Sequence, residues 1–233
     1  AQLGAIDELL REDVNGIALA PQNDDRIRIR INELSEQGIP VVTLNTDIEN
    51  SMRIAYVGSN YTRSGRTAAG LLRLMTHGDV RIGIITGSSD ILCHTERIAG
   101  FTDALKPYQE HMHIISIKET QDDEIASYEQ TARLLNEHPE INALFFAAGG
   151  VYGGCRAIAS LGLAGKLCVV AFDKAETTQQ FLRDGVLSAV ICQQPRIQGK
   201  KPLDLLFHYL TSGELPDREY HYTAVDIRIL ENI

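Results

Sequence analysis

The chain has 233 residues, of which 44% are hydrophobic and 23% charged, a composition typical of a globular protein with one large domain or two smaller lobes. Its formal net charge of −9 argues against DNA or an anionic membrane as a direct partner, because both require a basic protein surface. No apolar run is long enough to cross a bilayer, so the pattern predicts no membrane partner.

Short apolar runs recur from one end of the chain to the other and are typical of buried strands. Many of them are rich in β-branched residues and are followed by Gly, Asn or Asp, which interrupt a strand. The predicted strands are residues 16–20, 39–44, 53–57, 81–86, 113–117, 143–147, 168–172, 188–192 and 223–230.

Between these runs the apolar residues recur at helical spacing. Ile27, Ile31 and Leu34, for example, mark one face of a helix that Gly38 ends. Strands that alternate with helices predict an α/β fold with mostly parallel sheets covered on both faces. The strands are too numerous for one sheet, so we expect two lobes with a ligand-binding cleft between them. The predicted helices lie near residues 6–10, 27–34, 64–76, 95–105, 123–136, 152–161, 177–184 and 195–211.

Residues 81–101 combine a strand, a Gly-Ser loop that runs to Asp90, and the start of a helix. Ligands of open α/β sheets bind at the carboxyl ends of strands, where such loops lie. Arg97 lies about one helical turn beyond the loop, and its planar guanidinium could bind two neighbouring oxygens of a ligand. The alternative is a surface arginine paired with Glu96 or Asp103.

Eight segments, in order and with family spacing, resemble the type I periplasmic-binding-protein fold. Within that fold they resemble the effector-binding core of lactose-repressor (LacI) type transcription regulators. No single segment is specific, whereas their ordered succession is. The segments are DVNGIALAP (13–21), GIPVVTLNTDI (38–48), YVGSNYTRSGRTAAGLL (56–72), GIITGSS (83–89), ERIAGF (96–101), LFFAAGG (144–150), VVAFDK (169–174) and AVICQQPRIQG (189–199).

The resemblance implies two lobes, each built from separate stretches of chain. We expect residues 1–59 with 196–212 in the first lobe and 60–192 with 220–233 in the second, with crossovers near residues 59, 194 and 216. The family opens with a strand, a helix and a second strand that this chain lacks, so we expect an N-terminally truncated first lobe. A regulator would also carry a DNA-binding headpiece ahead of that.

The resemblance also implies a ligand site at the strand ends. Arg97 matches the arginine of an arginine-x-x-glycine-aromatic motif, and Asp173 matches a ligand-binding aspartate. Asn45 takes the place of a ligand-binding aspartate or its neighbour, and Gln193 matches a glutamine near the last crossover. Sugars suit this set, because charged groups form strong hydrogen bonds and amides both donate and accept. A structural alternative stays open for three of these residues: Asn45 as a turn residue, Asp173 as a helix cap and Gln193 as a partner of the crossover backbone.

Two tyrosines, Tyr61 and Tyr152, are further candidates for packing on a sugar face, although half-buried tyrosines more often serve only in packing. One departure from the resemblance concerns Gly149 and Gly150, which stand where many relatives have an Asn-Asp pair. The substitution removes a polar contact and leaves the identity of the ligand open. We favour a tight turn at these glycines over backbone contact with the ligand.

The function expected from the resemblance is that of a sugar-sensing regulatory domain. A small-molecule effector, a sugar, would close the lobes of a homodimer that reaches operator DNA only through the missing headpiece. The four cysteines lack metal-type spacing, and unpaired thiols favour the cytoplasm. The alternative is the sugar-binding component of an ABC transporter. An enzyme on this fold is less favoured, because no catalytic motif, metal site or cofactor motif is present.

Overall fold

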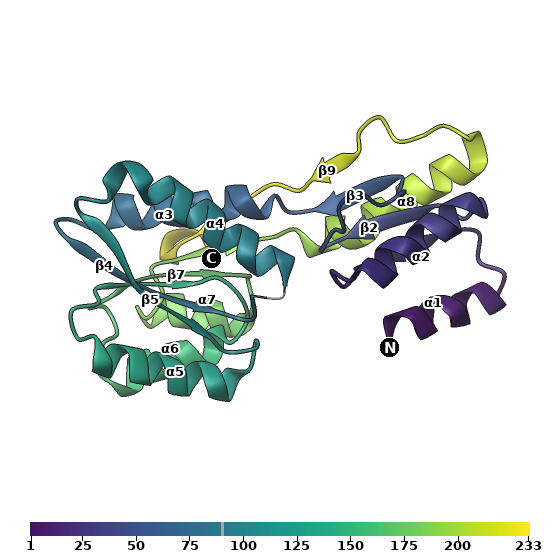
Figure 1. The fold of residues 1–233 in the computed structure, drawn as a ribbon. Coiled ribbons are helices and arrows are strands. Elements are labelled where there is room, and N and C mark those ends of the chain that lie inside the picture. Colours follow the sequence, from purple (N-terminus) through teal and green to yellow (C-terminus); the bar gives the residue numbers. More distant parts are fainter. Residues whose placement is uncertain (90) are drawn as a thin grey trace. The chain divides into compact units, whose positions relative to one another are not determined.

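The computed structural model describes residues 1–89 and 91–233, so Asp90 of the predicted loop lies outside the described residues. The chain divides into two units, each with its own sheet and helices (Figure 1). The first unit is residues 1–60 with 194–224, and the second is 61–193 with 225–233. The predicted fold class, α/β with parallel sheets flanked by helices, is confirmed.

The first unit is a parallel sheet in the strand order β1-β2-β3-β9. Helices α1 and α2 contribute Ile6 and Ile31 to the core on one face, whereas α8 contributes Leu205 and Leu206 on the other. Asp24 caps α2, since its carboxylate accepts a hydrogen bond from the Arg26 N–H at 2.8 Å. The elements are α1 (Gln2–Arg11), β1 (Ile17–Leu19), α2 (Asp25–Glu36), β2 (Val41–Leu44), β3 (Ala55–Gly58), α8 (Pro195–Ser212) and β9 (Tyr220–Tyr222).

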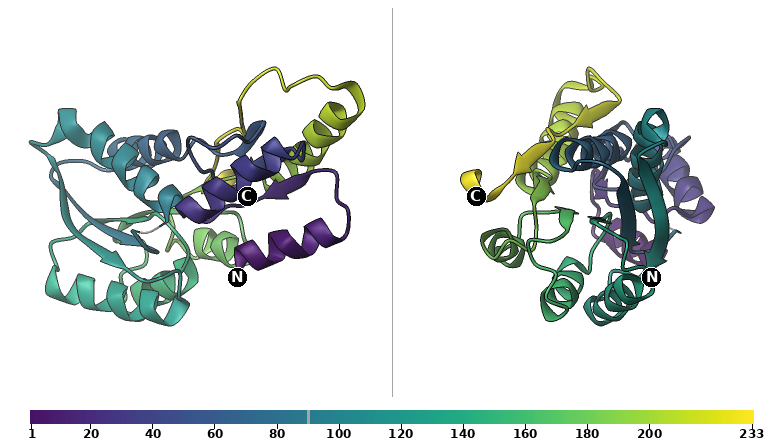
Figure 2. Two further views of the ribbon diagram at one scale, coloured as in Figure 1. Left: turned by 45° about the vertical axis from the view of Figure 1, so that its right-hand side comes forward. Right: turned by 90° about the vertical axis from the view of Figure 1, so that its left-hand side faces the viewer.

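The second unit has a sheet in the order β10-β8-β7-β6-β4-β5, in which only β10 runs antiparallel to its neighbour among the described strands. Helices α3 and α4 cover one face, and α5, α6 and α7 cover the other (Figures 1 and 2). The elements are α3 (Tyr61–Met75), β4 (Val80–Thr86), α4 (Leu92–Leu105), the 3₁₀ helix η1 (Lys106–Tyr108), β5 (Met112–Glu119), α5 (Glu124–Glu137), β6 (Ala143–Phe146), α6 (Val151–Ser160), β7 (Cys168–Phe172), α7 (Glu176–Arg183), β8 (Ala189–Cys192), β10 (Asp226–Arg228) and the 3₁₀ helix η2 (Leu230–Asn232).

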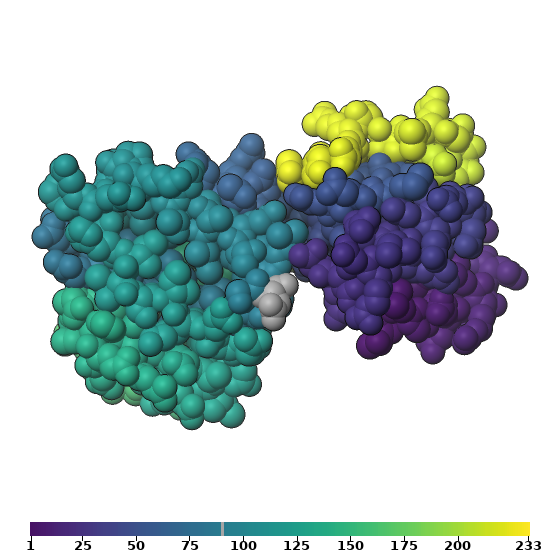
Figure 3. All heavy atoms as spheres, viewed as in Figure 1, coloured from purple at the N-terminus to yellow at the C-terminus, as the bar shows by residue number. Residues whose placement is uncertain are grey.

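The C-terminal segment differs from our expectation in two respects. We predicted one strand over 223–230 and placed 220–233 in the second lobe, but this stretch forms two strands in two sheets. Strand β9 pairs with β3 in the first unit, while β10 pairs with β8 in the second. The third crossover therefore lies between residues 224 and 225 rather than near 216. Figure 3 shows the yellow C-terminal atoms of the first unit against the blue atoms of the β3 region.

The β9 pairing is fixed by backbone hydrogen bonds that a hydrophobic pattern does not reveal. The Tyr56 N–H donates to Glu219 O, and the Thr223 N–H donates to Gly58 O, both at 2.8 Å.

The described part of the chain contains no helix that is both long and apolar enough to cross a membrane.

Candidate functional site

Arg97 is held in the second unit by close packing of α3 against α4. A Cβ atom on Gly65 would lie 1.9 Å from the Arg97 carbonyl oxygen, and one on Gly100 would lie 2.1 Å from the Thr62 carbonyl oxygen. Only glycine at both positions allows the two helix backbones to approach this closely. The backbone of Arg97 is therefore fixed before any ligand arrives.

The Arg97 side chain is only 4% exposed, so it is not a surface residue. Its Cζ lies 3.9 Å from the centroid of the Phe172 ring and 4.9 Å from that of Tyr61, and its Nη1 donates to Ala147 O at 2.8 Å. Among the described residues no carboxylate forms an ion pair with it, and Nε has no hydrogen-bond partner. A buried guanidinium with an unused N–H is costly unless another group binds it.

The structure therefore contradicts the alternative for Arg97, a surface arginine in an ion pair. Asp103, one of the two acidic partners we considered, instead pairs with Arg66 and Lys106. Tyr61 is 5% exposed and lies against the Arg97 guanidinium, where it supports this side chain.

Asp173 and Gln193 follow the neighbouring strands β7 and β8 and lie together. Gln193 Nε2 donates to Asp173 Oδ1 at 2.9 Å. Asp173 has a left-handed backbone conformation (φ +68°), and its main-chain oxygen accepts a hydrogen bond from Thr178 Oγ1. Its carboxylate does not cap α7, because the N-cap position of that helix is Ala175. The exposed Asp173 side chain therefore presents acceptor oxygens at the carboxyl edge of the sheet.

Tyr152 is the second residue of α6 at the same edge and is 42% exposed. The centroid of its ring lies 5.8 Å from that of Phe181 on α7, and the Arg156 Cζ lies over the Tyr152 ring, 5.8 Å from its centroid. The structure thus gives Tyr152 a packing role and leaves part of its ring open. Gly150 has φ +78°, which confirms the tight turn expected at the glycine pair.

Two polar residues at this edge were not singled out from the sequence. Thr86 ends β4, and its buried Oγ1 has no partner among the described residues. Asp122 follows β5, and its Oδ1 accepts a hydrogen bond from the Gly149 N–H at 2.8 Å. We predicted that this strand ends at residue 117, whereas β5 continues to Glu119, and the two extra residues concealed that Asp122 follows a strand end.

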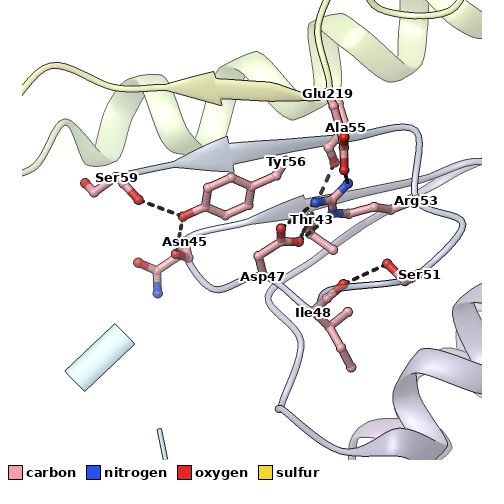
Figure 4. Close-up of polar contacts among 10 residues, drawn as sticks. All are labelled: Thr43, Asn45, Asp47, Ile48, Ser51, Arg53, Ala55, Tyr56, Ser59 and Glu219. Carbon is pink, nitrogen blue, oxygen red and sulfur yellow. Dashed lines mark hydrogen bonds and ion pairs between the residues drawn. The ribbon is translucent and has the colours of Figure 1, made fainter. Parts of the chain in front are cut away.

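Asn45 lies in the first unit, where it directly follows β2 (Figure 4). Its backbone is left-handed (φ +59°), which fits the turn alternative and is tolerated well by asparagine. Its N–H donates to Val57 O at 3.1 Å, and its carbonyl oxygen accepts a hydrogen bond from the Tyr56 hydroxyl at 2.9 Å. The turn that would present the Asn45 amide is therefore fixed by its main chain.

The loop after Asn45 is held by a buried ion pair (Figure 4). Arg53 binds the Asp47 carboxylate through Nε and Nη2, both at 2.5 Å, and binds Glu219 through Nη1 at 2.9 Å. The side chains of Arg53 and Asp47 are 3% and 12% exposed. The pKa of Arg53 is raised well above its usual value, because hydrogen bonds and charge attraction from Asp47 outweigh the effect of burial. This arginine is fully partnered, as a structural residue should be.

These groups can bind a neutral polyhydroxylated molecule. At the second unit's edge Arg97 supplies N–H donors, and Asp173 supplies acceptors. No group of three or more metal-binding side chains occurs among the described residues.

Two α/β units with polar side chains at the carboxyl ends of parallel strands define the type I periplasmic-binding-protein class. The chain belongs to the periplasmic binding protein domain family, whose model matches residues 1–215.

Relatives of the chain are sugar-binding proteins of transporters. It is 22% identical to the ribose import binding protein RbsB of Bacillus subtilis over 85% of its length, and it spans 64% of that relative. It is 24% identical to the D-allose-binding periplasmic protein of Escherichia coli over 92% of this chain and 72% of that one.

Solved structures with sugar-binding functions share the fold over almost the whole chain. An ABC transporter solute binding protein from Burkholderia graminis, in complex with D-arabinose, matches with a TM-score of 0.93 and 26% identity, covering 99% of this chain and 81% of that one. GanP, a glucose-galactose binding protein from Geobacillus stearothermophilus, matches with a TM-score of 0.91 and 25% identity, covering 99% and 82%.

These findings correct our functional expectation. The relatives are import and periplasmic binding proteins, so the assignment to a LacI-type regulator is wrong and its alternative is favoured. The homodimer, the headpiece and operator DNA followed from that assignment and lose their basis with it. The cytoplasmic location is likewise contradicted.

The cysteine argument failed for a physical reason. All four cysteines are free, but burial raises the pKa of each thiol, most strongly that of Cys155. A buried thiol with a raised pKa is a poor nucleophile and oxidises slowly. Free cysteines of this kind therefore do not identify a reducing compartment.

Proposed function

We propose that this chain is the sugar-binding component of an ABC importer and that it acts outside the cytoplasm. The observation that carries the proposal is the Arg97 guanidinium, which is buried, stacked on Phe172 and without a carboxylate partner among the described residues. The Asp173–Gln193 pair, which begins one residue after Phe172, supplies complementary acceptors. The named functions of the relatives support a sugar as the ligand.

The ligand class follows from the chemistry of this edge. A sugar presents vicinal hydroxyl groups that each donate and accept hydrogen bonds, and Arg97 and Asp173 supply one partner of each kind. We infer that the ligand is a pentose or hexose. Asn45 in the first unit remains a ligand contact proposed from the family resemblance, and Tyr152 remains a proposed packing contact.

A binding experiment tests the proposal directly. Thermal shift with a panel of aldopentoses and aldohexoses should identify one or a few stabilising sugars, and calorimetry should then give their affinity. Asp173→Asn should weaken that affinity roughly ten- to a hundredfold, because hydrogen bonds to charged groups contribute about 1.5–3 kcal/mol each. The matched control is Asp184→Asn at the far end of α7, which should bind as the wild type does. Absence of binding to every sugar would contradict the proposal.

A test in cells addresses transport. Deleting the gene should slow uptake of the radiolabelled sugar identified in the panel, and restoring it should recover uptake. Normal uptake in the deletion strain would contradict the importer assignment while leaving sugar binding intact. Turnover of the bound sugar into a new product would instead favour an enzyme.

A further inference from the structure

The turn after β5 has an unusual backbone. Gln121 and Asp122 are both left-handed, with φ of +53° and +58°. Left-handed residues other than glycine are uncommon, and two in succession persist only where surrounding contacts fix them. Here the Gln121 N–H donates to Gly87 O at 2.8 Å and the Asp123 N–H donates to Thr120 O at 2.9 Å. The first of these bonds joins the turn to the residue that follows β4, and the turn directs the Asp122 side chain towards the loop that follows β6.

The carboxylate of Asp122 occupies space that two glycines leave open. A Cβ atom on Gly149 would lie 2.9 Å from Asp122 Oδ1, and one on Gly87 would lie 2.5 Å from the same oxygen. Neither position could carry a side chain unless Asp122 moved. Position 149 follows β6 at the carboxyl edge of the sheet, so the Asp122 carboxylate lies where a side chain at 149 would otherwise begin.

The two oxygens of this carboxylate have different surroundings. Oδ1 accepts from the Gly149 N–H at 2.8 Å and lies 3.8 Å from His94 Nε2. Among the described residues, nothing donates a hydrogen bond to Oδ2, and the side chain is 39% exposed. One oxygen therefore fixes the orientation of the carboxylate, and the other remains available as an acceptor.

The charge of Asp122 is not neutralised by His94. Burial lowers the pKa of His94, so that its ring is uncharged at neutral pH. Arg97 lies one helical turn further along α4, and its Nη1 binds the carbonyl of Ala147, two residues before Gly149. Arg97 and Asp122 thus both contact the loop after β6, one as a donor and the other as an acceptor.

We propose that Asp122 is a further ligand-binding residue that determines specificity in the second unit, with Oδ2 accepting a hydrogen bond from a hydroxyl group of the ligand. The inference rests on the proposed sugar-binding function and deepens it. With Asp122 and Asp173 both anionic and Arg97 the cation beside them, this edge favours an uncharged sugar over a sugar acid or a sugar phosphate.

The experiment is a cycle that combines protein variants with deoxy sugars. Asp122→Asn retains an oxygen for the Gly149 N–H and tolerates the left-handed backbone, so the turn should survive. Asp122→Ala removes both oxygens. The matched control is Asp79→Asn, at the opposite end of β4, which should bind sugar as the wild type does. Each protein is titrated calorimetrically with the preferred sugar, with its monodeoxy analogues and with the corresponding uronic acid.

We expect both Asp122 variants to lose roughly ten- to a hundredfold in affinity for the parent sugar. One monodeoxy analogue should bind the wild type more weakly than the parent sugar but bind Asp122→Ala equally well, because the lost hydroxyl is the one that Asp122 accepts from. The uronic acid should gain affinity in Asp122→Asn relative to the parent sugar.

Two results would overturn the inference. One is unchanged sugar affinity in both variants. The other is an equal loss for the parent sugar and every deoxy analogue, since this would assign Asp122 to holding the loop rather than to contact with the ligand. If the wild type binds no sugar at all, the proposed function fails first, and the two failures are thereby distinguished.

Discussion

Each unit buries one arginine beside its sheet, Arg53 just before β3 and Arg97 on α4, and the two arginines differ in their partners. Arg53 in the first unit is neutralised by Asp47 and Glu219 and lies 5.0 Å from the centroid of Tyr220. Arg97 in the second unit is equally buried and lies between two aromatic rings, but it donates to a single carbonyl and its Nε has no partner among the described residues. Burial alone therefore does not separate the structural Arg53 from Arg97, for which we propose ligand binding, whereas the number of satisfied donors does.

The largest expected effect comes from breaking the satisfied pair. Arg53→Met leaves the Asp47 carboxylate buried without its partner, and removal of one member of a buried ion pair costs about 3–5 kcal/mol. Urea unfolding followed by circular dichroism measures the loss. The control is Arg66→Met, which breaks an exposed pair with Asp103 and should cost less than about 1 kcal/mol. Equal losses of unfolding free energy in the two variants would contradict the structural role of Arg53.

The same substitution at Arg97 should change stability little and sugar affinity strongly. Arg97→Met replaces a guanidinium that has no carboxylate partner among the described residues with an apolar chain that can fill the space between Phe172 and Tyr61. The unfolding free energy should therefore change by less than about 1 kcal/mol. Sugar affinity should fall by about a hundredfold, the equivalent of about 2.7 kcal/mol. Calorimetry and urea unfolding on one preparation test both statements. A loss of stability as large as that of Arg53→Met would show that both arginines are structural.

A smaller effect separates the two roles considered for Asn45. Asn45→Gly preserves the left-handed turn, because glycine adopts φ of +59° freely, but deletes the amide. If the amide contacts the sugar, affinity should fall about five- to tenfold with no loss of thermal stability. Asn50→Gly, at another left-handed position in the same unit, is the control and should bind normally. A variant that binds as the wild type does would leave Asn45 as a turn residue only.

The smallest effect is a pH dependence that each unit should show through one histidine. Burial lowers the pKa of His94 in the second unit and of His221 in the first. As pH falls below about 6.5, the ordinary histidine value, the unfolded chain takes up these protons before the folded one does. Stability is therefore fully present above that pH and declines below it.

Urea midpoints at pH 7.5 and 5.5 should consequently differ less in His94→Gln and in His221→Gln than in the wild type. A wild-type midpoint that is equal or higher at pH 5.5 would contradict the expectation.

Much of the fold was predictable, because the spacing of apolar residues along the chain indicates most of its strands and helices. The continuous apolar runs of β4, β6 and β7 and the helical spacing along α2 and α3 match the structure closely. Strand β9 was missed because its residues, Tyr220–Tyr222, are half-exposed and its hydrogen bonds are made with a strand far away in the sequence. Pairing over such a distance leaves no local pattern.

The candidate site was predictable only in part, for a related reason. Asp173 and Gln193 each follow a recognisable strand, and the structure joins them by a hydrogen bond. The sequence singles out Arg97 by its motif, but it does not reveal the difference in partners between the two buried arginines. Arg97 has no acidic partner among the described residues, whereas Arg53 has two, because the turn at Asp47 and the distant residue Glu219 both reach it. Asp122 was missed because β5 runs two residues beyond its predicted end and because no local sequence motif marks the left-handed turn that follows.

The pairing of β3 with β9 also sets the order in which this chain can fold. Arg53 and Glu219 are 166 residues apart, whereas the strands from β4 to β8 follow one another with only single helices between most of them. Contacts that are near in sequence form sooner, because less chain entropy is lost in closing them. The second unit can therefore complete its central strands while the first unit still lacks β9. During synthesis the edge of β3 stays unpaired until Tyr222 has left the ribosome, and for that interval it is open to pairing with another chain.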